Sequence, residues 1–245
     1  MKILKTLCLL VLLAYSCISD DEASEYVTDL TSYIEGKIYE TGAVIACAGN
    51  ESETSNAAAV YFYPEGDAEN FILFETASNN VDPNNFENYT RLQAEDFPVF
   101  NGYLRKFENN ITEERWFIVS FEMDGEIKLS NPILIKNQSQ PTIFSSDITI
   151  NQDTSQMPLF TWEVNSEADN AIFFEVVSNT NSDLISGTYT FETQFQYYNT
   201  SNVVLNITNG TPPDLTLGET YNITIMDVSE DNWINEFFIN QFIVQ

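Results

Sequence analysis

The chain has 245 residues, among them 37 Asp and Glu against 9 Lys and Arg, no histidine, and a formal net charge of −28. So negative a protein repels the phosphates of nucleic acid and the head groups of anionic lipid, which excludes both as electrostatic partners. Without histidine, every Ser-His, Cys-His and His-metal arrangement is excluded. No Gly-rich phosphate loop and no nucleophile elbow occurs either. Abundant carboxylates leave a glycoside-acting enzyme as the third hypothesis for the function, after ligand binding and scaffolding. We expect no enzyme activity.

Residues 1–16 have the composition of a secretory signal peptide. Lys2 and Lys5 precede an apolar run over residues 7–14, which is shorter than the ~20 residues that a membrane span needs. The small residue Ser16 stands directly before Cys17. Cleavage there would remove two lysines and leave a mature charge of 7 − 37 = −30. An ordinary signal peptide, in which the cysteine has no role, is the alternative.

An acidic segment follows Cys17 and consists of Ser19, Asp20, Asp21 and Glu22. The cleavage junction resembles that of bacterial lipoproteins, and the acidic segment resembles the export tag of Bacteroidetes-type surface lipoproteins. The resemblance implies a diacylglyceryl group on Cys17, outer-membrane lipid as its partner, and exposure at the cell surface. We expect residues 17–40 to form an acidic tether, with a short helix or strand near Leu30 and Tyr33.

The rest of the chain predicts an all-β protein made of two tandem β-sandwiches, residues 41–137 and 141–245. Short runs rich in Val, Ile, Phe, Tyr and Thr alternate with Asn, Asp, Gly and Pro clusters, and no long helical periodicity occurs. A polar segment that ends at Pro141 separates the two predicted units.

The predicted strand over residues 115–121 has two possible orientations. Strand alternation places either Trp116 and Ile118 in the core, or a second set of three residues, Phe117, Val119 and Phe121. The second set is larger, so Trp116 would lie on the outer face, against the neighbouring unit or a ligand.

Two acidic turns in the first unit contain oxygen ligands of the kind that calcium prefers. Glu65 and Asp67 lie in one turn, and Asp82 lies in the other. Because the spacing of an EF-hand loop is missing, calcium is a minor prediction and no other cofactor is expected.

The second unit contains the clearest family motif. Leu215, Gly218 and Tyr221 stand at the spacing of a tyrosine corner, and Trp162 falls in the position of a core tryptophan. These residues resemble fibronectin type III domains, which are immunoglobulin-like β-sandwiches. The resemblance implies that the tyrosine hydroxyl bonds back to the upstream backbone.

The loop over residues 227–236 is the first candidate binding site. Trp233 is a candidate for stacking on a sugar ring, with Asp231, Asn232 and Asn235 as candidates for binding its hydroxyls, since loops at the end of a sandwich commonly carry recognition. The alternative is that the Trp233 ring folds back and caps the edge of the sandwich.

Tyr197 and Tyr198 are the second candidate site, because alternation must turn one of the two rings outward. The sequence thus predicts a non-catalytic lipoprotein of the cell surface that presents or captures a ligand, with glycans favoured by analogy with the lipoproteins of polysaccharide-uptake systems. The competing hypothesis is a scaffold or adhesion subunit that binds another surface protein through an apolar patch near Trp116 and Ile118.

Overall fold

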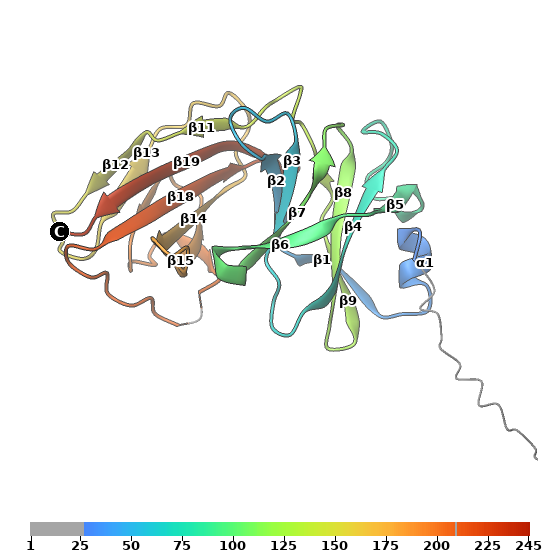
Figure 1. Cartoon of the computed structure of the whole chain (residues 1–245), viewed down its shortest axis with the longest axis horizontal. Helices are drawn as coiled ribbons and strands as arrows, with labels where there is room; N and C mark the ends of the chain where they lie inside the picture. The colour runs from blue at the N-terminus through green and yellow to red at the C-terminus, as the bar shows by residue number, and fades with distance from the viewer. Residues whose placement is uncertain (1–26, 209) are drawn as a thin grey trace, which may run out of the picture.

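The computed structural model describes residues 27–208 and 210–245, and within them the protein is almost entirely β. The predictions for the signal peptide, Cys17 and the acidic export segment lie outside the described residues. Figure 1 shows the N-terminal half, with the short helix α1 (Leu30–Ile34) at its far end, beside the C-terminal half. No helix in the described ranges has the length and apolar character needed to cross a membrane. The prediction of an all-β sandwich protein is confirmed.

The N-terminal half contains two sheets. The first sheet has the order β1 (Tyr39–Val44), β9 (Glu126–Ser130), β8 (Trp116–Met123), β4 (Glu69–Thr76) and β5 (Tyr89–Leu92), with β10 (Ile133–Leu134) also paired to β8. The second sheet has the order β2 (Ala46–Asn50), β3 (Ala58–Phe62), β7 (Leu104–Ile111) and β6 (Glu95–Val99). Two short 3-10 helices connect strands, η1 (Phe86–Asn88) and η2 (Phe100–Gly102).

The C-terminal half also contains two sheets. The third sheet has the order β11 (Ile143–Ser145), β19 (Ile234–Ile243), β18 (Thr220–Val228), β14 (Ile172–Asn179), β15 (Leu184–Thr190) and β17 (Val203–Asn206). The fourth sheet has the order β12 (Ile148–Asn151), β13 (Leu159–Trp162) and β16 (Gln194–Gln196).

The two halves repeat one strand arrangement. Each half begins with a strand that runs parallel to a strand near the end of that half. β1 runs along β9, which only the two-residue β10 follows, and β11 runs along β19. The chain then crosses to the other sheet and pairs antiparallel with the next strand, β2 with β3 and β12 with β13. The central orders β9-β8-β4-β5 and β19-β18-β14-β15 also correspond. Each half is therefore a pair of sheets of the same topology, with its own apolar core between them.

Both faces of β8 are buried, which decides the orientation of this strand. The larger apolar set points into the core between the first and second sheets and consists of Phe117, Val119 and Phe121. Ile118 points to the opposite face, and Trp116 lies half-buried beside it. The Trp116 indole N–H donates to the carbonyl of Asn79 at 3.1 Å.

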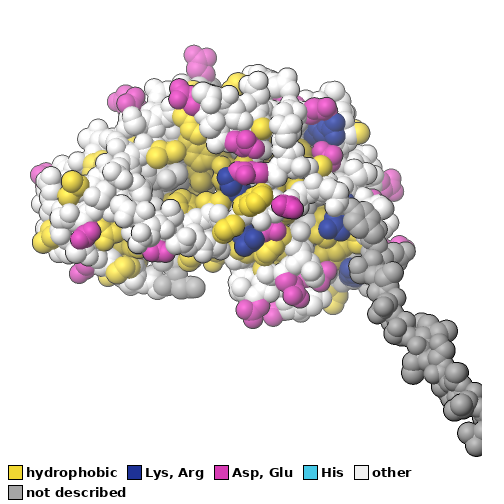
Figure 2. Space-filling model, viewed as in Figure 1, with side chains coloured by type: hydrophobic (Ala, Val, Ile, Leu, Met, Phe, Trp, Pro, Cys, Tyr) yellow, Lys and Arg dark blue, Asp and Glu magenta, His cyan; other side chains and the backbone are white. Residues whose placement is uncertain are grey.

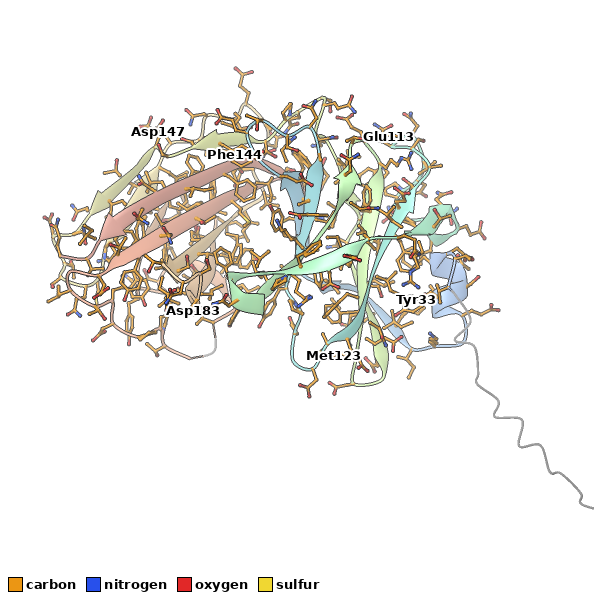
Figure 3. The ribbon with its side chains drawn as sticks, in the orientation of Figure 1. Tyr33, Glu113, Met123, Phe144, Asp147 and Asp183 are labelled. Atoms are coloured by element: carbon orange, nitrogen blue, oxygen red, sulfur yellow. The ribbon has the colours of Figure 1, made fainter. Side chains whose placement is uncertain are left out.

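Helix α1 covers that opposite face. Asp29 caps the helix by accepting from the backbone N–H of Ser32, and the buried side chains of Leu30 and Tyr33 pack on the first sheet. Figure 3 shows Tyr33 on the side of the helix next to the sheet. The short helix or strand expected near Leu30 and Tyr33 is helix α1, and it packs on the first sheet instead of extending freely as part of a tether. Trp116 packs in the apolar cluster that α1 also joins and not in the cluster between the two halves, so the expectation that it packs on the neighbouring unit is wrong.

The tyrosine-corner residues form an exposed turn before β18 that is held by the buried side chains of Leu215 and Tyr221. The Tyr221 hydroxyl accepts a hydrogen bond from the backbone N–H of Thr216 at 3.2 Å, Leu215 is buried, and Gly218 has a φ of +80°, which favours glycine. Trp162 is buried in the same core, between the third and fourth sheets.

The two halves share a third apolar cluster between the second and third sheets. Tyr61 of β3 packs edge-on against Phe237 of β19, with ring centroids 6.0 Å apart. Cys47 of β2 lies half-buried in the same cluster, and burial raises the pKa of its thiol to about 12. Since each sheet buries apolar side chains on both faces here, the halves pack as they would in a protein interior.

Candidate functional site

Trp233, the first predicted sugar-stacking residue, is completely buried. Its indole lies in the core of the N-terminal half, beside Val44 and Ile133. Its Nε1–H donates to the carbonyl of Gln140 at 2.9 Å. The β18–β19 loop thus inserts the Trp233 ring into the other half. Burying the large apolar indole there is more favourable than leaving it exposed to water in a polar loop. The prediction that Trp233 stacks on a sugar is wrong, and the ring caps the neighbouring sandwich rather than its own.

The polar residues around Trp233 also join the halves. Asp231 forms an ion pair with Lys136 at 2.5 Å, and the amide of Asn232 donates to the carbonyl of Pro132 at 3.0 Å. Asn235 is buried and accepts from the side-chain amide of Gln140 at 2.6 Å. These contacts use the polar atoms that were predicted to bind sugar hydroxyls, so the structure assigns Asp231, Asn232 and Asn235 to the junction between the halves.

The second predicted site offers no exposed aromatic pair. Tyr197 is buried, and its hydroxyl donates to the carbonyl of Pro213. Tyr198 is half-buried with a φ of +73°, and its ring tilts against that of Tyr197 at 6.1 Å. The left-handed backbone at Tyr198 ends the strand alternation, which is why neither ring stands out from the surface.

The predicted calcium ligands lie at opposite ends of β4. Glu65 and Asp67 precede this strand and Asp82 follows it, so roughly 25 Å of extended chain separates the two turns. Asp82 accepts from the backbone N–H of Asn84 at 2.9 Å, as in an ordinary Asx turn. Across the described residues, no three carboxylate or cysteine side chains lie close enough to hold a metal ion together.

A large open cleft lies on the C-terminal half, beside the fourth sheet. It has a volume of about 1140 Å³, is open to solvent, and is lined by residues from three segments, 146–149, 161–165 and 191–194. These are the start of β12, the end of β13 and the loop before β16. Figure 3 shows Asp147, one of the lining residues, at the outer edge of this half.

Phe191 is the main apolar feature of the cleft. Its side chain is 65% exposed, and no other aromatic side chain in the described part of the chain is as exposed. Glu163, Asn165 and Glu192 line the same cleft and are also exposed. An exposed ring edged by carboxylates and amides can stack on the C–H face of a sugar while the polar groups bind its hydroxyls. We call this feature the Phe191 cleft.

Hydrogen bonds fix the walls of the Phe191 cleft. The backbone N–H of Trp162 donates to the carbonyl of Thr193 at 3.2 Å, which ties the end of β13 to the loop before β16. Asn165 donates through both its backbone N–H and its side-chain amide to the buried carboxylate of Glu236, each at 2.8 Å. A site whose walls are already ordered loses less conformational entropy when it binds a ligand.

A buried carboxyl group supports the Phe191 loop from behind. Glu175 on β14 is fully buried, and the Thr190 hydroxyl lies 2.7 Å from its Oε1 and 2.9 Å from the carbonyl of Glu192. One hydroxyl proton can serve only one acceptor, so both contacts form when Glu175 is protonated and donates to Thr190, which then donates to Glu192. Burial raises the pKa of Glu175 to about 8, which is consistent with this arrangement.

Sequence reasoning missed both Phe191 and Glu175. The alternation of Phe173, Glu175 and Val177 marks Glu175 as an inward-facing charge, and this signal could have identified it. For Phe191 no comparable signal exists, because a phenylalanine that follows an alternating strand usually belongs to the core.

No protein-family model and no curated protein matches the chain. Among solved structures, the chain is similar to the Endo-D glycoside hydrolase domain from Streptococcus pneumoniae R6, with a TM-score of 0.32, 9% identity, and coverage of 82% of this chain and 33% of that one. It is also similar to a β-glucuronidase from Ruminococcus gnavus in complex with D-glucaro-1,5-lactone, with a TM-score of 0.29, 10% identity, and coverage of 76% and 35%. The chain therefore spans about a third of the length of these proteins. Similarity at this level indicates neither a shared substrate nor a shared activity, and the resemblance to fibronectin type III domains and surface lipoproteins stays a prediction.

Proposed function

We propose that the protein is a non-catalytic glycan-binding lipoprotein of the cell surface, built from two fibronectin type III-like sandwiches on a lipid anchor at Cys17. The observation that carries the proposal is the exposed ring of Phe191 in a polar cleft of about 1140 Å³. Ligand sites commonly combine an aromatic side chain with a few convergent polar groups, and Phe191 stands beside such groups in this cleft.

The position of the described N-terminus supports an anchored arrangement. Helix α1, which begins three residues after the first described residue, lies at the end of the N-terminal half that faces away from the C-terminal half (Figure 1). An acyl chain on Cys17, ten residues before the first described residue, would hold that end near the membrane. The Phe191 cleft would then lie on the half farther from the lipid, where extracellular polymers reach it.

A glycan array probed with the soluble chain from Ser19 onward tests the proposal. Binding is expected in calcium and in chelator alike, and it should disappear in Phe191→Ala. Phe97→Ala is the matched control, because the Phe97 ring is 40% exposed and lies on β6 in the other half. If both variants lose binding equally, or if neither variant loses binding, the Phe191 cleft is not the glycan-binding site.

A protein-binding scaffold is the second candidate function. Ile239 and Ile243 lie on one face of β19 and are 49% and 58% exposed. Two exposed isoleucines on a sheet face suit a protein partner better than a sugar. An array without any glycan signal, together with loss of a partner in Ile239→Ser, would favour this function.

A further inference from the structure

The distribution of charge along the chain is strongly uneven. All 9 Lys and Arg lie at or before Lys136, and residues 137–245 contain no cation. This C-terminal stretch contains 14 acidic residues: Asp147, Asp153, Glu163, Glu167, Asp169, Glu175, Asp183, Glu192, Asp214, Glu219, Asp227, Glu230, Asp231 and Glu236. In Figure 2 the Lys and Arg side chains accordingly lie over the N-terminal half, and none lies over the C-terminal half.

The Phe191 cleft lies within this cation-free half. Three of its lining residues are the carboxylates Asp147, Glu163 and Glu192, and all three are exposed. Lys136, the last cation of the chain, forms an ion pair with Asp231 and lines a different, smaller cleft. No lining residue of the Phe191 cleft can therefore neutralise a negative group on a ligand.

The hydrogen-bonding groups of the cleft also favour an uncharged ligand. Ionised carboxylates only accept hydrogen bonds. Glu192 already accepts from the amide of Gln194 at 2.8 Å, and a carboxylate has further lone pairs available. Sugar hydroxyls can supply the protons that such a site lacks, whereas the carboxylate or sulfate of an acidic sugar brings more acceptors and a like charge.

We infer that the Phe191 cleft binds glycans without acidic groups and rejects uronic and sulfated ones. The inference rests on the proposed function and gives its ligand a chemical class. Phe191 supplies the stacking surface, the three carboxylates accept from hydroxyls, and the negative field of the half repels polyanions. Rejection of this kind is a repulsive element of specificity, separate from the attractive contacts of the ring.

Matched sugars that differ only in charge test the inference. Cellohexaose, mannohexaose, maltohexaose and laminarihexaose are titrated into the soluble chain, each beside its C6-oxidised form, in which primary hydroxyls have become carboxylates. We expect at least one neutral sugar to bind in a Phe191-dependent manner, and its oxidised form to bind at least about tenfold more weakly at low salt. The gap should shrink between about 10 mM and about 1 M salt, because the screening length falls from about 30 Å to about 3 Å.

Two variants that each add one positive charge test whether the repulsion of acidic sugars arises at the Phe191 cleft. Thr193→Lys adds a cation inside the cleft, whereas Thr180→Lys adds the same charge beyond the opposite end of β14, and both threonines are exposed. Thr193→Lys should raise the affinity for the oxidised sugar several-fold more than Thr180→Lys does. Equal effects of the two variants, or Phe191-dependent binding of oxidised sugars as tight as that of the neutral ones, would overturn the inference but leave the proposed function intact. If no sugar of either kind binds through Phe191, the proposed function itself fails and the inference fails with it.

Discussion

The indole N–H of Trp233 donates a 2.9 Å hydrogen bond to the carbonyl of Gln140, inside the core of the N-terminal half. Gln140 belongs to the segment that joins the halves, so the last loop of the protein and its linker are fixed to one another. The backbone N–H of Ala48 also donates to the carbonyl of Asn232 at 2.9 Å, directly beside this contact. Trp233, a candidate ligand contact in the sequence, is thus a residue that fastens the two halves together.

Trp233→Ala should destabilise the junction by about 3–5 kcal/mol, the usual cost of removing a fully buried large aromatic side chain. Guanidinium unfolding followed by tryptophan fluorescence and circular dichroism measures this. We expect the two probes to separate, because halves that no longer share a core unfold at different concentrations. A single unchanged transition would show that the junction does not depend on the ring.

Tyr221→Phe should cost about 1 kcal/mol, because the backbone N–H of Thr216 loses its acceptor. Tyr39→Phe serves as the control, since Tyr39 is 44% exposed. The difference in free energy of unfolding between the two variants isolates the corner hydrogen bond. Identical stabilities would mean that this bond contributes nothing.

The fold and the site differ in how far the sequence predicts them. Alternation identifies Phe117, Val119 and Phe121 as one buried face, because a strand has only two faces to choose from. The five residues of α1 are too few to show helical periodicity, and their burial depends on the sheet beneath them. Trp233 lies among polar residues, and its partner Gln140 is 93 positions away, so local pattern alone cannot reveal that it is buried.

Stability should fall as the pH rises from about 4.5 to about 8, because of Glu175. Its pKa is raised to about 8 in the folded protein from an ordinary 4.5, so the folded state binds more protons in this window than the unfolded state. The slope from this one group reaches at most about 1.4 kcal/mol per pH unit. Melting temperatures across this range measure it.

Glu175→Gln should remove that part of the slope, since the amide stays neutral and donates to Thr190 as the protonated acid does. Glu163→Gln removes an exposed carboxylate and corrects for the change in net charge. If the slopes of the two variants coincide, Glu175 is not the group that titrates.

Cys17→Ala tests the anchor, which lies outside the described residues. A chain attached through acyl groups on Cys17 should move from the membrane fraction to the soluble fraction when the acceptor sulfur is lost. Fractionation with an antibody against the mature chain measures this. A variant that still sediments with the outer membrane would contradict lipid attachment at this cysteine.

Titration of a neutral array-positive glycan into Phe191→Ala shows whether the exposed ring of Phe191 binds sugar. Removing the ring should weaken binding by at least about 1 kcal/mol, as truncation of a dominant binding residue does. The melting temperature should stay unchanged because the side chain is 65% exposed. Phe97→Ala should bind as the unaltered protein does. If Phe191→Ala binds the glycan with full affinity, the cleft is not the binding site and the account is wrong.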